Sequence, residues 1–137
     1  MSAIAFVRPR LAVDIPAFLV GSLFAYEDLL GVFPALVATR PAWAGPPLNA
    51  VALTSERLIA FDRQGVTEST FAVTLSAVTG VSSPDDARSG RLSAVSPAAD
   101  LHLADLVPED AVFAQAIVYN AAAGTLYRAG QSEANEP

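Results

Sequence analysis

Short apolar segments, separated by residues that form turns, fill the middle of the chain from Ala35 to Leu106. Glycine, proline, serine and aspartate stand between the segments, and these residues favour tight changes of chain direction. Each segment is long enough for a β-strand but too short for a stable helix, and strands joined by tight turns run antiparallel. The expected strands are residues 35–40, 48–53, 57–63, 67–75, 78–82, 91–95 and 101–106.

Two hairpins and two loops are expected within this region. Residues 54–56 form a tight turn between two apolar segments, and residues 96–100 form a second turn of the same kind. Residues 41–47 hold three prolines and one glycine, which predicts a loop. Residues 83–90 are also predicted to be an exposed loop, from their serine, aspartate and glycine content.

A helix is expected at each end of the strand-rich region. Pro108 begins the C-terminal helix, with two acidic residues in the first turn, and Gly124 is expected to stop it. The N-terminal helix is predicted to run from Asp14, as its N-cap, to Leu30, with Gly31 ending it.

The uncharged stretch 15–26 lies inside that N-terminal helix. A membrane-spanning helix needs about 20 apolar residues, so this run predicts no membrane span. Asp14 intervenes after the preceding arginines and no small-residue cleavage site follows, which disfavours a signal peptide. We therefore expect a cytoplasmic protein in which this helix is covered.

Together these elements predict one domain of the α+β class. Residues 1–13 form an N-terminal arm and residues 14–31 the apolar helix. Residues 35–124 hold the strands and the C-terminal helix, and residues 125–137 form a polar tail that we expect to be disordered.

The segment 53–65, LTSERLIAFDRQG, resembles the strand–turn–strand signature of bacterial pleckstrin-homology-like (PH-like) domains, and residues 73–82 are similar to a later strand and turn of that family. The resemblance covers residues 36–123, although Ser55 stands where the family has aspartate. It implies a PH-like bent antiparallel sheet or partly open barrel of about seven strands, capped by the C-terminal helix, with the N-terminal helix as an addition. No functional residue is carried over from the family, and Arg57 is expected to hydrogen-bond carbonyls near its turn. The matching positions are Leu53, Thr54, Arg57, Leu58, Ile59 and Phe61.

Composition disfavours several partners. The chain has no cysteine, which excludes disulfides, thiol catalysis and cysteine-based metal sites. All eight cationic residues are arginines scattered along the chain, and the net charge is −6, so nucleic acid and anionic lipid are unfavourable partners. The exclusive use of arginine is typical of GC-rich bacterial or phage genomes.

No catalytic, cofactor or metal residues are predicted, so we expect the protein not to be an enzyme. His102 is the single histidine, and strand alternation places Asp100 on the same face, but no motif supplies a nucleophile or an oxyanion site. We expect His102 to face solvent. The adjacent Asp85 and Asp86 lack the spacing of a calcium loop, and no glycine-rich phosphate loop is present.

The strongest candidate for a partner surface is the apolar N-terminal helix, because its large side chains span more than one narrow stripe. Trp43, in the proline-rich loop, is either a lid over the core or an exposed anchor for a partner. The sequence therefore predicts a non-enzymatic protein-interaction or self-association module, with a homo-oligomer as the expected assembly. Two alternatives stay open, namely a structural or assembly protein of a phage or bacterial multi-subunit particle, and a small enzyme or ligand carrier with a pocket between sheet and helix. The residues of this predicted partner surface are Phe18, Leu19, Leu23, Phe24 and Trp43.

Overall fold

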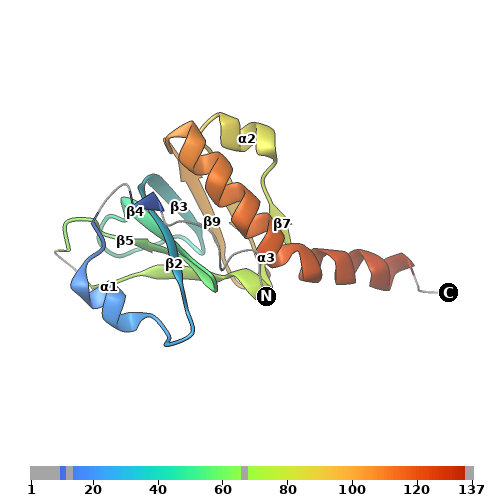
Figure 1. The fold of residues 1–137 in the computed structure, drawn as a ribbon, viewed down its shortest axis with the longest axis horizontal. Coiled ribbons are helices and arrows are strands. Elements are labelled where there is room, and N and C mark those ends of the chain that lie inside the picture. The colour runs from blue at the N-terminus through green and yellow to red at the C-terminus, as the bar shows by residue number, and fades with distance from the viewer. Residues whose placement is uncertain (1–9, 12–13, 66–67, 135–137) are drawn as a thin grey trace.

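Two mostly antiparallel β-sheets and a long C-terminal helix form an α+β structure (Figure 1), as the sequence predicted. The computed structural model describes residues 10–11, 14–65 and 68–134, with 124–134 described for their backbone alone. The elements, in chain order, are β1 (Arg10–Leu11), α1 (Ala17–Ser22), β2 (Leu29–Pro34), β3 (Leu36–Arg40), β4 (Ala50–Thr54), β5 (Arg57–Phe61), β6 (Phe71–Thr74), the 3-10 helix η2 (Leu75–Ala77), β7 (Gly80–Val81), α2 (Pro84–Arg88), β8 (Leu92–Val95), β9 (Asp100–Ala104) and α3 (Pro108–Ala134).

One bent stretch of chain belongs to both sheets. The first sheet has the strand order β1-β2-β4-β5-β6 and the second has the order β3-β9-β8-β7. Strands β2 and β3 follow one another with Ala35 between them, so this segment pairs with β4 in one sheet and with β9 in the other. Neighbouring strands are antiparallel apart from the parallel pair β1–β2.

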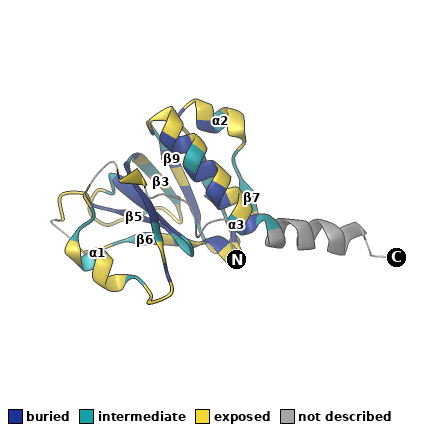
Figure 2. Ribbon diagram, viewed as in Figure 1, coloured by how far each residue is buried: buried dark blue, intermediate teal, exposed yellow. Residues whose placement is uncertain are grey.

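The main core lies where both sheets and α3 pack together (Figure 2). Phe33, Leu53 and Leu101 contribute fully buried side chains from the sheets. Helix α3 adds Ile117 and Val118, which are also buried. Removing this much apolar surface from water is the dominant favourable contribution to folding.

A second apolar cluster lies on the opposite face of the five-stranded sheet, where Leu19 of α1 packs against Val32, Ile59 and Phe61. Successive residues of a strand point to opposite faces, so strands between two apolar layers are buried throughout. All five residues of β4 are buried for this reason. Helix α1 therefore acts as a cover for the outer face of the sheet.

The predicted N-terminal helix 14–31 is wrong in its extent. Helix α1 covers only Ala17–Ser22, with Pro16 rather than Asp14 at the N-cap position, and Leu29–Pro34 forms strand β2. Helical spacing of apolar residues was a misleading signal here, because pairing of β2 with β4 outweighs local propensity. Gly31 lies within β2 instead of ending a helix, and a Cβ there would come within 2.4 Å of the Phe33 ring.

Two further expectations need correction. Residues 83–90 contain a short helix, α2, in which the Ser83 hydroxyl accepts a hydrogen bond of 3.1 Å from the Asp86 amide. Serine followed by proline and two aspartates is a helix-start pattern, and here it outweighs the loop-like composition of the segment. Helix α3 also continues through Gly124 to Ala134, so the predicted tail is helical up to that point. A glycine inside a helix costs about 1 kcal/mol, which does not end a helix by itself.

The strand predictions agree better with the structure. Strand β3 and the hairpins β4–β5 and β8–β9 lie where the sequence places them. The strand expected at 67–75 is shorter, because β6 covers Phe71–Thr74 and η2 follows it, while Thr67 lies outside the described residues. Of the predicted arm, Arg10–Leu11 forms β1, and residues 1–9, 12 and 13 lie outside the described part of the chain. Residues 135–137 of the predicted tail also lie outside it.

Replacing Ile117 with alanine should lower the free energy of unfolding by about 2–4 kcal/mol, because this side chain is 6% exposed within the main core. Urea denaturation measures the change. Tyr119→Ala on the same helix is the control, since Tyr119 is 50% exposed, and its effect should stay below about 1 kcal/mol. Equal effects of both substitutions would contradict the packing of α3 against the sheets.

Candidate functional site

Two aromatic side chains stand exposed on the connection between α1 and β2. Phe24 and Tyr26, the aromatic pair, stack with ring centroids 5.4 Å apart and ring planes 16° apart. Phe24 is 49% exposed and Tyr26 is 69% exposed. The two rings together form an apolar surface that the described residues leave open to solvent.

The residue that follows this pair, Glu27, carries a buried carboxylate that accepts a hydrogen bond from the Phe24 amide. The Glu27 side chain is fully buried and receives four hydrogen bonds, two on each oxygen. Oε1 accepts from Arg57 Nη2 at 2.6 Å and from the Phe24 amide at 3.0 Å. Oε2 accepts from Arg57 Nε at 2.8 Å and from the Thr54 hydroxyl at 2.5 Å. Every strong acceptor position of the carboxylate is thereby satisfied, as burial of a charge requires.

This environment stabilises the charged forms of both partners. Hydrogen bonds from Arg57, and then from Thr54 and the Phe24 amide, lower the pKa of Glu27 to about 2, although burial acts in the opposite direction. The hydrogen bond with Glu27 also raises the pKa of Arg57 above its ordinary value. The pair is therefore ionised throughout the neutral range.

Arg57 links the aromatic pair to the sheet. Its guanidinium carbon lies 4.7 Å from the centroid of the Phe24 ring, within the range of a cation–π contact. Its Nη2 also donates to the carbonyl of Ser22 at the end of α1, at 3.3 Å. Arg57 was expected to bond carbonyls near its own turn, but the carbonyl that it contacts belongs to Ser22, 35 residues away, and its main partner is the carboxylate of Glu27.

The turn between β4 and β5 lies next to the same connection. The Asp28 amide donates to the Ser55 hydroxyl, and the Ser55 amide donates to the Asp28 carbonyl, both at 2.9 Å. The Glu56 amide donates to the hydroxyl of Thr54, which in turn contacts Glu27. Hydrogen bonds therefore hold the turn, with Asp28 and Glu56, beside the aromatic pair.

The structure divides the residues of the predicted partner surface. Leu19 is buried, and Phe18 and Leu23 pack against the outer cluster, so these three side chains cover the sheet. Phe24 is exposed and belongs to the aromatic pair. Tyr26, Glu27 and the Arg57 contact extend that site beyond the predicted residues. In the sequence, Glu27 stands out only as the acidic residue that ends the uncharged stretch 15–26. Its partner Arg57 is 30 residues away, so the sequence does not reveal the pair.

Trp43 lies elsewhere, between the two sheets' edges. Its indole Nε1 donates to the Pro46 carbonyl at 2.7 Å, and its ring meets the Phe71 ring edge-on with centroids 6.1 Å apart. The side chain is partly buried. It lines an open hollow of about 530 Å³ together with Val37 and Leu48. Trp43 thus combines features of a lid and of an exposed anchor.

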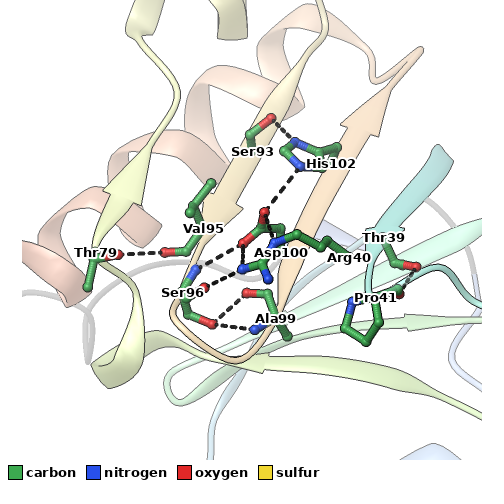
Figure 3. Close-up of polar contacts among 10 residues, drawn as sticks. All are labelled: Thr39, Arg40, Pro41, Thr79, Ser93, Val95, Ser96, Ala99, Asp100 and His102. Carbon is green, nitrogen blue, oxygen red and sulfur yellow. Dashed lines mark hydrogen bonds and ion pairs between the residues drawn. The ribbon is translucent and has the colours of Figure 1, made fainter.

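A polar group occupies the outer face of the four-stranded sheet (Figure 3). His102 and Asp100 share this face, and the His102 side chain is 45% exposed, as predicted. Sequence reasoning missed Ser93, whose hydroxyl lies 2.8 Å from His102 Nδ1. Ser93 is directly opposite His102 in the β8–β9 register, so this contact follows once the hairpin pairing is known.

This group has the residue types of a catalytic triad but a different geometry. In a triad the carboxylate hydrogen-bonds the imidazole and orients it. Here Arg40 donates hydrogen bonds to both carboxylate oxygens of Asp100, from Nε at 2.7 Å and from Nη2 at 2.9 Å. The His102 Nε2 atom lies 3.8 Å from Asp100 Oδ2, which is too far for a hydrogen bond. The hydrogen bonds from Arg40 lower the pKa of Asp100. The arrangement ties β3 to the β8–β9 hairpin and does not orient His102 as a base.

Other kinds of site receive little support from the described residues. Within residues 10–11, 14–65 and 68–134, no group of three or more histidine or acidic side chains could hold a metal ion. Asp85 and Asp86 instead pair with Arg88 and Arg91. Among the helices that the structure describes, none has both the length and the apolar character needed to cross a membrane.

No family model matches the chain, and no curated protein matches its sequence.

Replacing Glu27 with glutamine should make stability less dependent on pH. A carboxyl group whose pKa falls from 4.5 to about 2 on folding contributes about 3 kcal/mol. Because the folded-state pKa is the lower one, this contribution is present above pH 4.5 and is lost as the pH falls through about 2. Glu27→Gln should therefore be destabilised by about 3 kcal/mol at neutral pH, and its stability should converge with that of the wild type in acid.

Urea denaturation at a series of pH values measures this difference. Glu56→Gln is the control, because among the described residues Glu56 has no ion-pair partner. It should follow the wild-type curve. Parallel pH curves for the wild type and Glu27→Gln would contradict the assigned role of the buried pair.

Proposed function

We propose that this chain is a non-enzymatic protein-interaction module with a PH-like fold. The strand order supports the fold assignment. If β2 and β3 count as one bent strand, then this strand and β4 to β9 make seven strands, followed by a helix that packs on them. This is the arrangement that the resemblance at residues 53–65 implies.

The exposed aromatic pair is the observation that carries the functional proposal. Phe24 is 49% exposed and Tyr26 is 69% exposed, and among the described residues no element covers them. Arg57 and Glu27 hold Phe24 in place, and Tyr26 stacks on the Phe24 ring. Rigid aromatic residues lose little conformational freedom on binding, and tyrosine and arginine are enriched among the residues that dominate interface energies. A protein partner fits such a surface best.

Selection from a phage-displayed library of random dodecapeptides tests this function. Selection is made on the wild-type protein, and the enriched peptides are then measured on a Phe24→Ser/Tyr26→Ser double variant. We expect at least a tenfold loss of affinity, about 1.4 kcal/mol, because the apolar contact area is removed. Both side chains are exposed, so the substitutions should leave the unfolding midpoint nearly unchanged.

Tyr119→Ser is the matched control, since Tyr119 is an exposed tyrosine on a different element. It should bind the selected peptides as the wild type does. Failure to enrich any peptide, or equal binding to all three proteins, would overturn the assignment of the aromatic pair as an interface.

Vesicles with anionic lipids should not bind the protein, even at low ionic strength. The net charge is −6. Each cationic residue near an anionic membrane surface contributes about 1 kcal/mol to binding, so few accessible arginines give weak attraction. Within the described part of the chain, the arginines that pair with a carboxylate are Arg10, Arg40, Arg57, Arg88 and Arg91.

Co-sedimentation with phosphatidylserine-containing vesicles, compared with neutral vesicles, measures this binding. Salt-sensitive sedimentation with the anionic vesicles would contradict this prediction. It would indicate that the exposed rings bind a membrane surface and not a protein.

A further inference from the structure

We infer that the partner of the aromatic pair is a basic protein segment, in which arginine or lysine stands next to an apolar residue. This inference rests on the proposed function and adds the chemistry of the partner. Phe24 and Tyr26 supply the apolar part of the surface, and acidic residues stand in the adjoining segment and turn.

The charge around the aromatic pair is negative. Asp28 and Glu56, the acidic rim, lie in the segment and turn that the Asp28–Ser55 hydrogen bonds hold together. In the part of the chain that the structure describes, neither carboxylate has an ion-pair partner. The charge of Arg57 is matched by Glu27, so these four groups sum to −2 (+1 from Arg57 and −3 from the three acids).

The rings can also accept a cation directly. Arg57 already lies 4.7 Å from the Phe24 centroid, which establishes that a guanidinium and these aromatics are compatible neighbours. Tyr26 is 69% exposed, so most of its ring surface is open to an incoming side chain. An arginine or lysine there would combine a cation–π contact with attraction to the acidic rim.

The same charges disfavour other occupants. An acidic peptide or a nucleic acid would meet the acidic rim with like charge. A second copy in a two-fold dimer would place the same surface against itself, and two surfaces of charge −2 would then face each other. A basic segment of another protein would instead bind through apolar contact with the aromatic pair and through attraction to the acidic rim.

The composition of the selected peptides gives the first readout. The pool that depends on Phe24 and Tyr26 should be enriched in arginine or lysine beside aromatic or aliphatic residues. One such peptide is then synthesised with fluorescein, together with versions in which its cationic residues are replaced by glutamine or by glutamate. Fluorescence anisotropy should show the order basic, neutral, acidic, with at least a tenfold loss at the first step and weaker binding of the basic peptide at higher salt.

Variants of the acidic rim give the second readout. Asp28→Asn/Glu56→Gln should weaken binding of the basic peptide by about threefold to tenfold and reduce its salt dependence, while leaving the neutral peptide unaffected. Glu109→Gln, an exposed acid at the start of α3, is the control and should bind as the wild type does.

Three outcomes would overturn the inference and leave the proposed function standing. These are a pool that needs the aromatic pair but is neutral or acidic, binding that is insensitive to salt and to the acidic rim, and a dimer in sedimentation equilibrium that Phe24→Ser/Tyr26→Ser abolishes. The last result would make a second copy the occupant. Loss of all dependence on the aromatic pair would instead overturn the proposed function itself.

Discussion

Pro34 and Ala35 let one stretch of chain leave the five-stranded sheet and enter the four-stranded sheet, and the packing of the molecule follows from that bend. Ala35 is small and buried, and its amide donates to the Asn49 carbonyl at 3.1 Å, so the chain changes sheets without an unsatisfied donor. Phe33, just before the bend, meets Phe113 of α3 edge-on at 6.4 Å between ring centroids. The bend therefore brings both sheets and α3 to one core.

A buried ion pair stabilises a loop only if its hydrogen bonds offset the cost of removing two charges from water. Well-packed apolar side chains often give equal or greater stability. Glu27 and Arg57 nevertheless have four hydrogen bonds to the carboxylate and a guanidinium placed over an aromatic ring. Apolar replacements could fill the same volume but could not fix the direction of the Phe24 amide or the position of the ring. Their geometric role explains the pair better than a contribution to stability alone.

Sequence patterns predicted the parts of the fold that depend on local signals. The turn at 54–56 fixed the β4–β5 hairpin, and the proline and acidic residues after Val107 marked the start of α3. Local signals failed where tertiary pairing decides the outcome. Leu29 and Leu30 continue the helical spacing of the apolar residues before them but begin strand β2, because β4 offers this segment a hydrogen-bonding partner. The site was less predictable still, because Glu27 and Arg57 are 30 residues apart and no local pattern links them. The contact between Ser93 and His102 likewise depends on the register of β8 with β9.

Helix α1 has six residues and no side-chain cap, so little within the helix itself keeps it folded. Its hold on the sheet comes from Leu19 and from the contacts that Arg57 and Glu27 make at its C-terminal end. Local opening of this cover would release an apolar sheet face that includes Val32, Ile59 and Phe61. Exposed apolar surface of this kind promotes association with other chains. The ion pair thus restrains the segment that covers this apolar sheet face.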